Sequence, residues 1–229
     1  MEYKGKDTMK YVYSPWIFED IRKWDSLVKK EYLVNIKKRV VIYEQEDEIE
    51  YVYILKKGRV RLLYIAPDGT EHVMLFVLPG GIFGEAECIE ERQSFFRAET
   101  LSEVSLYKLP KSVVLAAMKD RELCILMMKN MMKKLSLIET EFISMSVDDT
   151  KTRVARTLLC AADTFGAMDE GFRRIELTIT QQDIANLVNS TRLTVGNILR
   201  EFIGRGLIKK ERNHFYILDK EGLERELIK

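Results

Sequence analysis

The residues from Thr180 to Arg200 have the types and spacings of two short helices joined by a turn, with polar side chains left on one face. Thr180 and Asp183 are three residues apart, as in a capping box in which Asp replaces the usual Glu, and they predict the start of a short helix. The tripeptide at 189–191 predicts a turn and a second N-cap, followed at once by another helix. The apolar residues that the two helices would bury are Ile184, Ala185, Leu187 and Val188 in the first, and Val195, Ile198, Leu199 and Phe202 in the second.

The second predicted helix leaves a different set of side chains pointing away from its apolar face. These are Arg192, Leu193, Asn197 and Arg200. Two short helices joined by a tight turn form a helix-turn-helix, whose second helix enters the major groove of DNA by its N-terminal residues. A β-hairpin is expected to follow, with strands at 207–210 and 215–218. Its basic residues within reach of DNA phosphates are Lys209, Lys210 and Arg212. The alternative is a winged helix that contacts only protein.

The elements before this module must position it. From Arg121 to Met145 the chain has no Gly or Pro, and apolar residues recur at the alternating +4 and +3 spacing of a heptad seam. The seam residues are Cys124, Met128, Met131, Leu135, Ile138, Phe142 and Met145. This spacing predicts a long helix that pairs with the same helix of a second chain through a Met-rich, adaptable interface. The alternative is a helix packed on its own domain, which the apolar residues Leu126, Met127 and Met132 would support.

Short β-branched and aromatic runs predict strands between about Val34 and Leu109, and their near-regular spacing predicts a closed or rolled β-structure. The clearest runs are Val40–Tyr43, Tyr51–Leu55, Val60–Tyr64 and His72–Val77. After the seam helix, residues 148–150 predict the cap of a helix that continues to about Thr164. A connector containing Gly and a strand at 174–179 are expected next.

The composition limits the classes of protein. The chain has 229 residues, with 37 Lys+Arg against 36 Asp+Glu and 46% hydrophobic residues, which suits one large or two modest packed domains. The net charge of +1 conceals a local excess, because six basic residues stand against three acidic ones between 180 and 215. Three well-separated cysteines suit a reducing compartment. No apolar run approaches the roughly 18–20 residues that span a bilayer. Residues 1–13 lack the apolar core of a secretory signal, so we expect a cytoplasmic protein without a membrane partner.

Several short motifs, taken in order, make the sequence resemble the Crp/Fnr family of bacterial transcription regulators. They are Val60-Arg61-Leu62, Asp68-Gly69-Thr70-Glu71, Pro79-Gly80, Phe83-Gly84-Glu85, Arg97-Ala98-Glu99-Thr100 and the stretch from Thr191 to Arg200. The matches cover most of the chain.

The resemblance implies an α+β chain in three parts. An effector-sensing, double-stranded β-helix domain (a jelly roll of the cyclic-nucleotide-binding type) is expected at 1–119, a dimerisation helix and hinge at 120–147, and a winged helix-turn-helix domain at 148–229. The implied partners are a second copy of the chain, double-stranded DNA, a small-molecule effector and RNA polymerase. The two DNA half-sites would lie about one helical turn apart in an inverted repeat. Effector binding would reorient the DNA-binding domains, in an activator or a repressor.

The resemblance also assigns roles to residues of the helix-turn-helix. Family members place base contacts at the first exposed residues of the recognition helix, which here are Arg192, Leu193 and Asn197. Arg192 suits the O6/N7 edge of guanine, Asn197 suits the N6/N7 edge of adenine, and Leu193 can touch a thymine methyl. The residues expected at phosphates are Thr180, Gln181, Ser190, Thr191, Thr194 and Arg200, together with Lys209 and Lys210 of the hairpin.

For the effector, two branches of the family offer matches. Cyclic-AMP binders hold phosphate and ribose with Gly-Glu and a later Arg-Ser-Ala, which Gly84-Glu85 and Arg92-Gln93-Ser94 match across a shorter loop. Their two adjacent hydroxyls on the dimer helix correspond to Ile138 and Glu139, a poor partner for adenine. A surface ion pair between Glu85 and Arg92 is the alternative role for these residues.

Regulators of halorespiration that bind chlorinated phenolic acids offer the second match. A dimer-helix lysine contacts their anionic effector, and Lys129-Asn130 and Lys134 resemble that segment. Lys134 falls at heptad position g, from which it can face its own β-roll. We therefore expect a small anionic or aromatic organic effector, with cyclic AMP as the alternative. A solvated Lys134 that supports the coiled coil is the other interpretation.

Haem and redox sensing are further alternatives within the family. An iron–sulfur sensor needs four clustered thiolates, and no cysteine precedes Cys88. His72 is the candidate haem ligand, and Cys88 or Cys124 the candidate redox switch.

We expect no enzyme, and therefore no catalytic or metal-binding residue. Cupin-like enzymes share the β-roll but need a set of His and carboxylate ligands, and the chain has only His72 and His214, in different end domains. Neither a nucleophile–His arrangement nor a P-loop is present. A cyclic-nucleotide-regulated subunit of another protein would leave the helix-turn-helix unexplained.

The chain departs from the family at two turns of the roll. Arg39 and Glu46 stand where the family commonly has Gly. These turns must therefore form without a residue to which positive φ is freely accessible.

Overall fold

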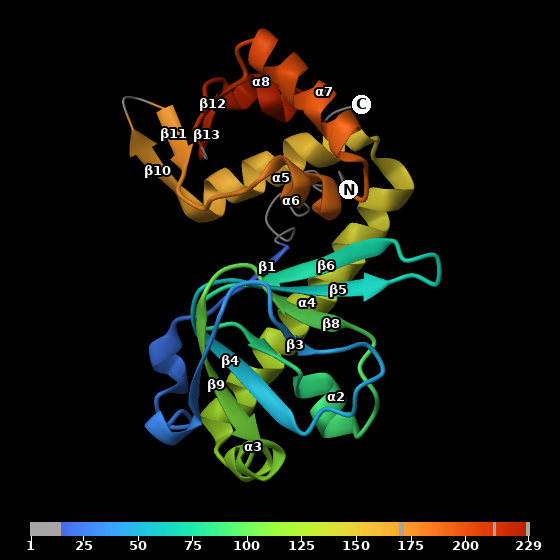
Figure 1. The fold of residues 1–229 in the computed structure, drawn as a ribbon. Coiled ribbons are helices and arrows are strands. Elements are labelled where there is room, and N and C mark those ends of the chain that lie inside the picture. The colour runs from blue at the N-terminus through green and yellow to red at the C-terminus, as the bar shows by residue number, and fades with distance from the viewer. Residues whose placement is uncertain (1–14, 170–171, 213, 228–229) are drawn as a thin grey trace, which may run out of the picture. The chain divides into compact units, whose positions relative to one another are not determined.

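The computed structural model describes residues 15–169, 172–212 and 214–227. The chain divides into two compact units, one from Pro15 to Leu135 and one that holds the described residues from Ser136 onward. Figure 1 labels most of the elements of both units. The predicted absence of a signal peptide concerns residues 1–13, which lie outside the described residues.

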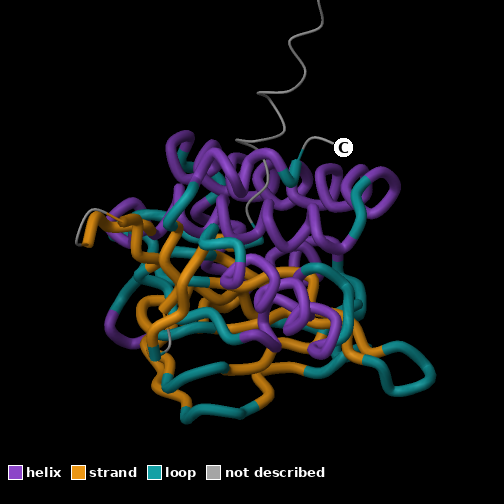
Figure 2. The backbone as a smooth tube through the Cα atoms, turned by 90° about the horizontal axis from the view of Figure 1, so that it is seen from above, coloured by secondary structure: helices purple, strands orange, loops and turns teal. Residues whose placement is uncertain are grey.

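The first unit is a β-roll built from two sheets. One sheet has the strand order β1-β6-β5-β8-β3 and the other β2-β9-β4-β7. The strands are β1 (Trp16–Ile17), β2 (Leu33–Ile36), β3 (Val41–Tyr43), β4 (Tyr51–Lys57), β5 (Val60–Ile65), β6 (Glu71–Val77), β7 (Ile82–Phe83), β8 (Arg97–Thr100) and β9 (Val104–Pro110). The four predicted strand runs are thus confirmed. The strands, orange in Figure 2, are joined mostly by short loops, as the turn signals require.

Short helices complete the roll. They are the 3-10 helices η1 (Ile21–Trp24) and η2 (Lys30–Tyr32) and the α-helices α2 (Glu85–Glu90) and α3 (Lys111–Ala117). The core between the sheets includes Ile54, Leu63 and Leu106, none of which has exposed surface. Trp24 of η1 is equally buried, and its indole Nε1 donates a hydrogen bond to the carbonyl of Gly80 at 2.9 Å.

The two turns without glycine keep the left-handed backbone conformation. Arg39 has φ 61° and Glu46 has φ 69°, a region that residues with a Cβ enter at a steric cost. Long-range hydrogen bonds offset this cost. The N–H of Arg39 donates to the carbonyl of Thr100 at 2.9 Å, and the N–H of Glu46 donates to the carbonyl of Ser94 at 2.8 Å. The departure from the family therefore changes the residue type at these turns without removing the positive φ.

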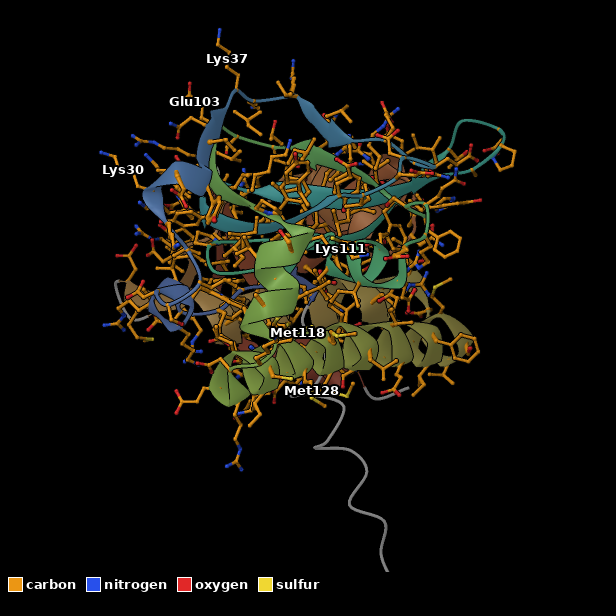
Figure 3. The ribbon with its side chains drawn as sticks, turned by 90° about the horizontal axis from the view of Figure 1, so that it is seen from below. Lys30, Lys37, Glu103, Lys111, Met118 and Met128 are labelled. Carbon is orange, nitrogen blue, oxygen red and sulfur yellow. The ribbon has the colours of Figure 1, made fainter. Side chains whose placement is uncertain are left out.

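The long helix α4 runs from Arg121 to Val147, as the heptad spacing predicts. Its seam side chains from Met128 to Met145 are 40–73% exposed, while Leu126 and Met127 on another face are buried. Figure 3 labels Met128 on α4. Met132 does not add to the internal packing that the alternative interpretation expected, because it is 54% exposed. The helix thus buries one face and leaves its heptad seam uncovered.

The second unit contains the helix-turn-helix and a four-stranded sheet of order β10-β11-β13-β12. Its elements after α4 are α5 (Thr150–Phe165), β10 (Gly166–Asp169), β11 (Phe172–Ile175), α6 (Gln181–Leu187), α7 (Arg192–Gly204), β12 (Ile208–Glu211), β13 (His214–Ile217) and α8 (Lys220–Arg225). The predicted cap of α5 is confirmed, since the Asp149 carboxylate accepts the N–H of Thr152 at 2.8 Å.

The strand expected at 174–179 is misplaced. β11 lies earlier, and β10 occupies the stretch expected to be a connector. β11 ends at Ile175 because its partners are set by the tertiary structure: β10 pairs along one side, and Arg173 and Arg174 pair with Ile217 and Tyr216 of β13 on the other. Within the described residues, no helix is long and apolar enough to cross a membrane.

Candidate DNA-binding surface and effector site

The caps of α6 and α7 form as the sequence predicts. The Thr180 hydroxyl accepts the N–H of Asp183 at 3.0 Å, and the Asp183 carboxylate accepts the N–H of Thr180 at 2.8 Å, which completes a capping box. The Thr191 hydroxyl accepts the N–H of Thr194 at 3.1 Å and so caps α7. Between the helices, Asn189 takes φ 46°, which allows the tight turn.

The predicted apolar face holds the two helices together. Ile184, Ala185, Leu187, Val188, Val195, Leu199 and Phe202 are buried, and Ile198 is half-buried. The opposite face of α7 is open: Arg192, Leu193, Asn197 and Arg200 are all exposed, with Leu193 at 72%. The structure therefore brings the predicted base-reading residues together on one exposed surface.

Two of these residues already interact with each other. The Arg200 guanidinium donates one hydrogen bond to the Asn197 side-chain oxygen and another, at 3.4 Å, to the carbonyl of Gly196. To read the N6/N7 edge of adenine, Asn197 must offer both its oxygen and its NH₂ group. The Asn197 oxygen already accepts one hydrogen bond from a neighbouring residue of the same helix, and its second lone pair can accept another.

The residues expected at phosphates have internal roles as well. Thr180 and Thr191 are N-caps, so their hydroxyls are already used as acceptors. The Gln181 side chain donates to the carbonyl of Arg192 at 2.8 Å. Ser190 is half-buried, and Thr194 is exposed.

The predicted hairpin wing is formed by β12 and β13, which pair antiparallel from Ile208–Ile217 to Glu211–His214. The Lys209 ammonium lies 3.0 Å from the Glu211 carboxylate and 4.4 Å from the centre of the Tyr216 ring. Lys210 and Arg212 are exposed. The Lys210 ammonium lies 5.2 Å from the centre of the Phe215 ring, so both lysines lie over aromatic rings and they differ in the carboxylate that pairs with Lys209.

A cluster of charges behind α7, not identified from the sequence, joins α7 to the helices that carry it. Lys151 of α5 pairs with Glu201 of α7 at 2.5 Å and with Glu226, just after α8, at 3.0 Å. Arg205 pairs with the same two carboxylates at 3.1 and 2.7 Å. Burial raises the pKa of Glu226, but the hydrogen bonds from Arg205 and Lys151 outweigh it and leave the pKa below its ordinary value. The i,i+4 spacing of Glu201 and Arg205 was the available signal.

In the roll, the structure brings Glu85 and Lys134 together. Glu85 opens α2 and is 3% exposed, and its carboxylate pairs with the Lys134 ammonium. Lys134 also donates to the carbonyl of Ile82 at 2.8 Å. The interpretation of Lys134 as a solvated lysine is wrong, because its side chain is 17% exposed and it faces its own β-roll. Gly84 precedes this pair with φ 77°, and a Cβ there would lie 3.1 Å from the carbonyl oxygen of Tyr51.

The other predicted effector residues are engaged elsewhere. Arg92 pairs with Glu90 at 2.5 Å and Glu87 at 3.7 Å, and lies over the Phe95 ring at 4.6 Å. The ion pair between Arg92 and Glu85 is therefore not formed, because Lys134 takes the Glu85 carboxylate. Gln93 forms a β-bridge with Glu48. The Ser94 hydroxyl donates to the carbonyl of Phe96 at 2.8 Å.

Aromatic residues inside the roll were missed by the sequence reasoning. Tyr53 and Phe83 stack with ring centres 5.0 Å apart, and Tyr43 lies 5.9 Å from Tyr53. Burial raises the pKa of Tyr53 to about 12. Burial and the neighbouring carboxylates of Glu87 and Glu85 raise the pKa of Tyr43 well above its ordinary value. The alternation of Tyr51 and Tyr53 along β4 was the available signal.

The residues considered for metal binding or redox sensing form no cluster among the described residues. Within the described residues, no group of three or more His, Cys, Asp or Glu side chains could hold a metal ion. Cys88 and Cys160 are buried, Cys124 is partly exposed, and burial raises the pKa of the Cys88 thiol. His214 Nδ1 lies 3.0 Å from the carbonyl oxygen of Ile175.

A β-roll followed by a long helix and a winged helix-turn-helix is the architecture of ligand-responsive, DNA-binding regulators. Known protein families agree with this. Residues 33–121 match the cyclic nucleotide-binding domain, and residues 152–226 match the Crp-like helix-turn-helix domain.

Individual relatives agree as well. The chain is 27% identical over 201 residues to the CRP-like cAMP-activated global transcriptional regulator of Mycobacterium tuberculosis, across 87% of this chain and 90% of that protein. The crystal structure of a CRP-family transcriptional regulator from Thermus thermophilus superposes with a TM-score of 0.70 at 28% identity, covering 85% of this chain and 96% of the other. CprK complexed with OCPA shares the fold, with a TM-score of 0.75 at 14% identity over 94% of this chain and 99% of CprK. The protein belongs to the Crp/Fnr family of effector-responsive transcription regulators.

Proposed function

We propose that the protein is a homodimer that binds an inverted-repeat promoter site through α7 and the wing, under the control of a small anionic, aromatic effector in the β-roll. The observation that carries the DNA-binding part is the exposed face of α7. It presents Arg192, Leu193 and Asn197, while the opposite face of the helix packs into its domain. A guanidinium at the first position of a recognition helix, without an ion pair among the described residues, is suited to a bidentate contact with guanine.

The dimer is supported by the uncovered seam of α4. Met128, Leu135, Ile138 and Phe142 recur at heptad spacing and expose 47–73% of their surface. A continuous apolar stripe of this kind is stable in water when a second helix covers it. A two-fold dimer would present its two α7 helices to two half-sites about one helical turn apart.

The anionic effector is supported by the pairing of Glu85 with Lys134. A cyclic-AMP binder uses the Gly-Glu carboxylate for the ribose hydroxyls, whereas here that carboxylate is bound to an ammonium. The Lys134 ammonium has three N–H groups and uses them on Glu85 and on the carbonyl of Ile82, so one more can donate to an anionic ligand beside Glu85. The nearby rings of Tyr43, Tyr53 and Phe83 suit an aromatic ligand.

Selection from a random duplex library tests the DNA-binding part. The selected sequences should be inverted repeats, and Phe142→Glu, which places a charge on the seam, should yield monomers by analytical ultracentrifugation and lose most of the affinity. Ile143→Glu is the matched control, since Ile143 is a neighbouring exposed apolar residue, 44% exposed, outside the seam. Selected sites without two-fold symmetry, or a dimer that survives Phe142→Glu, would contradict the proposal.

Isothermal titration tests the effector part. Heat should be released with at least one member of a panel of benzoic and chlorinated phenolic acids, and the double variant Glu85→Gln/Lys134→Met should abolish it without unfolding the protein. Cyclic AMP is the second candidate, favoured by the cyclic nucleotide-binding domain match and the cAMP-activated relative. Heat with cyclic AMP and none with the panel would refute the aromatic-acid effector in favour of the nucleotide.

A further inference from the structure

The side chain of Gln181, the first residue of α6, reaches across to the first turn of α7. Its Nε2 donates to the carbonyl oxygen of Arg192 at 2.8 Å, and the side chain is partly shielded from solvent. Arg192 is the first residue of α7 and the predicted guanine reader. A single hydrogen bond therefore joins the start of one helix to the backbone that carries the main base-reading side chain.

Gly196 provides the space in which this side chain lies. A Cβ at Gly196 would stand 2.2 Å from Nε2 of Gln181 and 3.3 Å from its Cδ, and the first of these distances is shorter than real Cβ contacts allow. Glycine inside a helix lowers its stability relative to alanine, so its presence in α7 calls for a packing reason. The Gln181 amide supplies that reason.

The capping box of Thr180 and Asp183 fixes the backbone on both sides of Gln181, so a Cβ at Gly196 would displace the amide end of the side chain rather than its backbone. Its neighbour Gln182 is different: it is exposed, and its amide donates at 2.8 Å to Asn186, one turn along the same helix. The two adjacent glutamines thus differ in one respect, since only Gln181 contacts the recognition helix.

We propose that Gln181 is a residue that positions Arg192 for reading the DNA sequence. The missing side chain of Gly196 leaves the space that the Gln181 amide occupies. The bond to the Arg192 carbonyl holds the first turn of α7 at one rotation, so that the Arg192 guanidinium meets a base edge with both of its N–H groups in line. A bidentate contact tolerates little displacement, so loosening this turn reduces discrimination between bases more than it reduces attraction to phosphates. This inference rests on the proposed DNA-reading role of α7, and it assigns Gln181 to a protein contact rather than to the phosphate expected from the family.

The test is a double-mutant cycle on the full-length protein, comparing Gln181→Ala, Gly196→Ala, the double variant and the control Gln182→Ala. Three duplexes are titrated by fluorescence anisotropy: the selected operator, the operator with its Arg192-contacted base pair replaced, and an unrelated sequence.

Gly196→Ala should lower the ratio of the affinities for the selected and the substituted operator about tenfold, because the new methyl displaces the Gln181 amide. Gln181→Ala should lower it less, by about threefold to fivefold. The double variant should resemble Gln181→Ala rather than add the two losses. Gln182→Ala should match the wild type, and affinity for the unrelated duplex should change less than about twofold throughout.

Three outcomes would overturn the inference. Losses that add in the double variant would show that Gly196 does not leave this space for Gln181. An equal loss on all three duplexes in Gln181→Ala, with a smaller salt dependence, would show a phosphate contact instead. An unchanged discrimination ratio in Gln181→Ala would show that the bond positions nothing.

Unfolding curves of the same variants show whether a loss of discrimination comes from a folding defect. The double variant should recover the stability that Gly196→Ala loses. Failure of the proposed function is distinguishable, because the wild-type protein itself would then prefer no sequence. Loss of discrimination confined to the Gln181 and Gly196 variants supports the positioning role.

Discussion

The two candidate sites of this protein hold their polar groups in opposite ways. In the β-roll, Glu85 is 3% exposed and already paired with Lys134, whereas on α7 the side chains of Arg192 and Leu193 are exposed. Glu85 and Lys134 already neutralise each other, and leaving either one buried without its partner is costly. On α7, the proposed base-reading side chains are held at the surface by the apolar residues that pack on the opposite face of the helix. The charged groups of the proposed effector site are thus paired with each other, whereas the side chains of the proposed reading surface face solvent.

The largest effect on stability is expected at the buried ion pair between Glu85 and Lys134. Lys134→Met should lower the free energy of unfolding by about 3–5 kcal/mol at pH 7, because it leaves the Glu85 carboxylate buried without a cation. Tryptophan fluorescence during urea unfolding measures this, since both tryptophans, Trp16 and Trp24, are buried in the same unit.

The neighbouring Lys133 supplies the control for this measurement. It pairs with Glu19 at 3.0 Å with its side chain 49% exposed, so Lys133→Met should cost only about 0–1 kcal/mol. Adding Glu85→Gln to Lys134→Met should restore part of the loss. Equal losses of unfolding free energy for Lys134→Met and Lys133→Met would show that the buried pair contributes no more stability than the surface pair.

The next effect concerns the open site. Arg192→Ala should cost about 1–3 kcal/mol of binding free energy at one base pair and little elsewhere, because a guanidinium reads one guanine edge. Affinities for operators substituted one base pair at a time measure it. Uniform loss at every sequence would remove the base-reading role and leave Arg192 as a phosphate contact.

The response to acid should differ in sign between the two units. Burial raises the pKa of Glu87 in the roll, so the folded state binds this proton more tightly than the unfolded state does. Its destabilising effect is complete above the folded pKa and is relieved as the pH falls toward the ordinary value of 4.5. The difference in stability between wild type and Glu87→Gln, followed by tryptophan fluorescence, should change in favour of wild type as the pH is lowered from 7 to 4.5.

Glu226 behind α7 should behave in the opposite way. Despite burial, its hydrogen bonds to Arg205 and Lys151 lower its pKa, so its stabilising effect is present above 4.5 and is lost as the pH falls through the lower, folded value. Hydrogen exchange of α5, α7 and α8 amides should show wild type losing its advantage over Glu226→Gln below pH 4.5. The same sign for Glu87 and Glu226 would contradict the contrast between the units.

The smallest effect distinguishes two adjacent lysines of the wing. Lys210→Ala should reduce the slope of log K against log salt concentration by about 1, whereas Lys209→Ala should reduce it less, because Glu211 already neutralises Lys209 at 3.0 Å. Glu211→Gln should release Lys209 and steepen the slope. If Lys209 contributes as much as Lys210, the Glu211 pair does not persist on DNA.

Much of the fold could be predicted because local patterns determine it. The +4 and +3 spacing from Cys124 to Met145 depends only on residues of one helix, and it predicted α4 correctly. The capping residues Thr180 and Thr191 act within three residues of themselves, so the starts of α6 and α7 were also predictable. The strand near 174–179 was misplaced because its bounds depend on β10 and β13, which no local pattern reveals.

The sites were predictable in their residues but not in their connections. The sequence by itself predicted that the second helix of the helix-turn-helix exposes a polar face, and that Glu85, Arg92 and Lys134 are candidate effector residues. Only the tertiary structure decided that Lys134 rather than Arg92 pairs with Glu85, and that Gln181 bonds to the Arg192 backbone in the space left by Gly196. The physical reason is the range of the forces involved. Helix starts and apolar faces follow from neighbours a few residues apart, whereas the partner of a buried charge or amide is chosen among groups that folding brings together from distant parts of the chain.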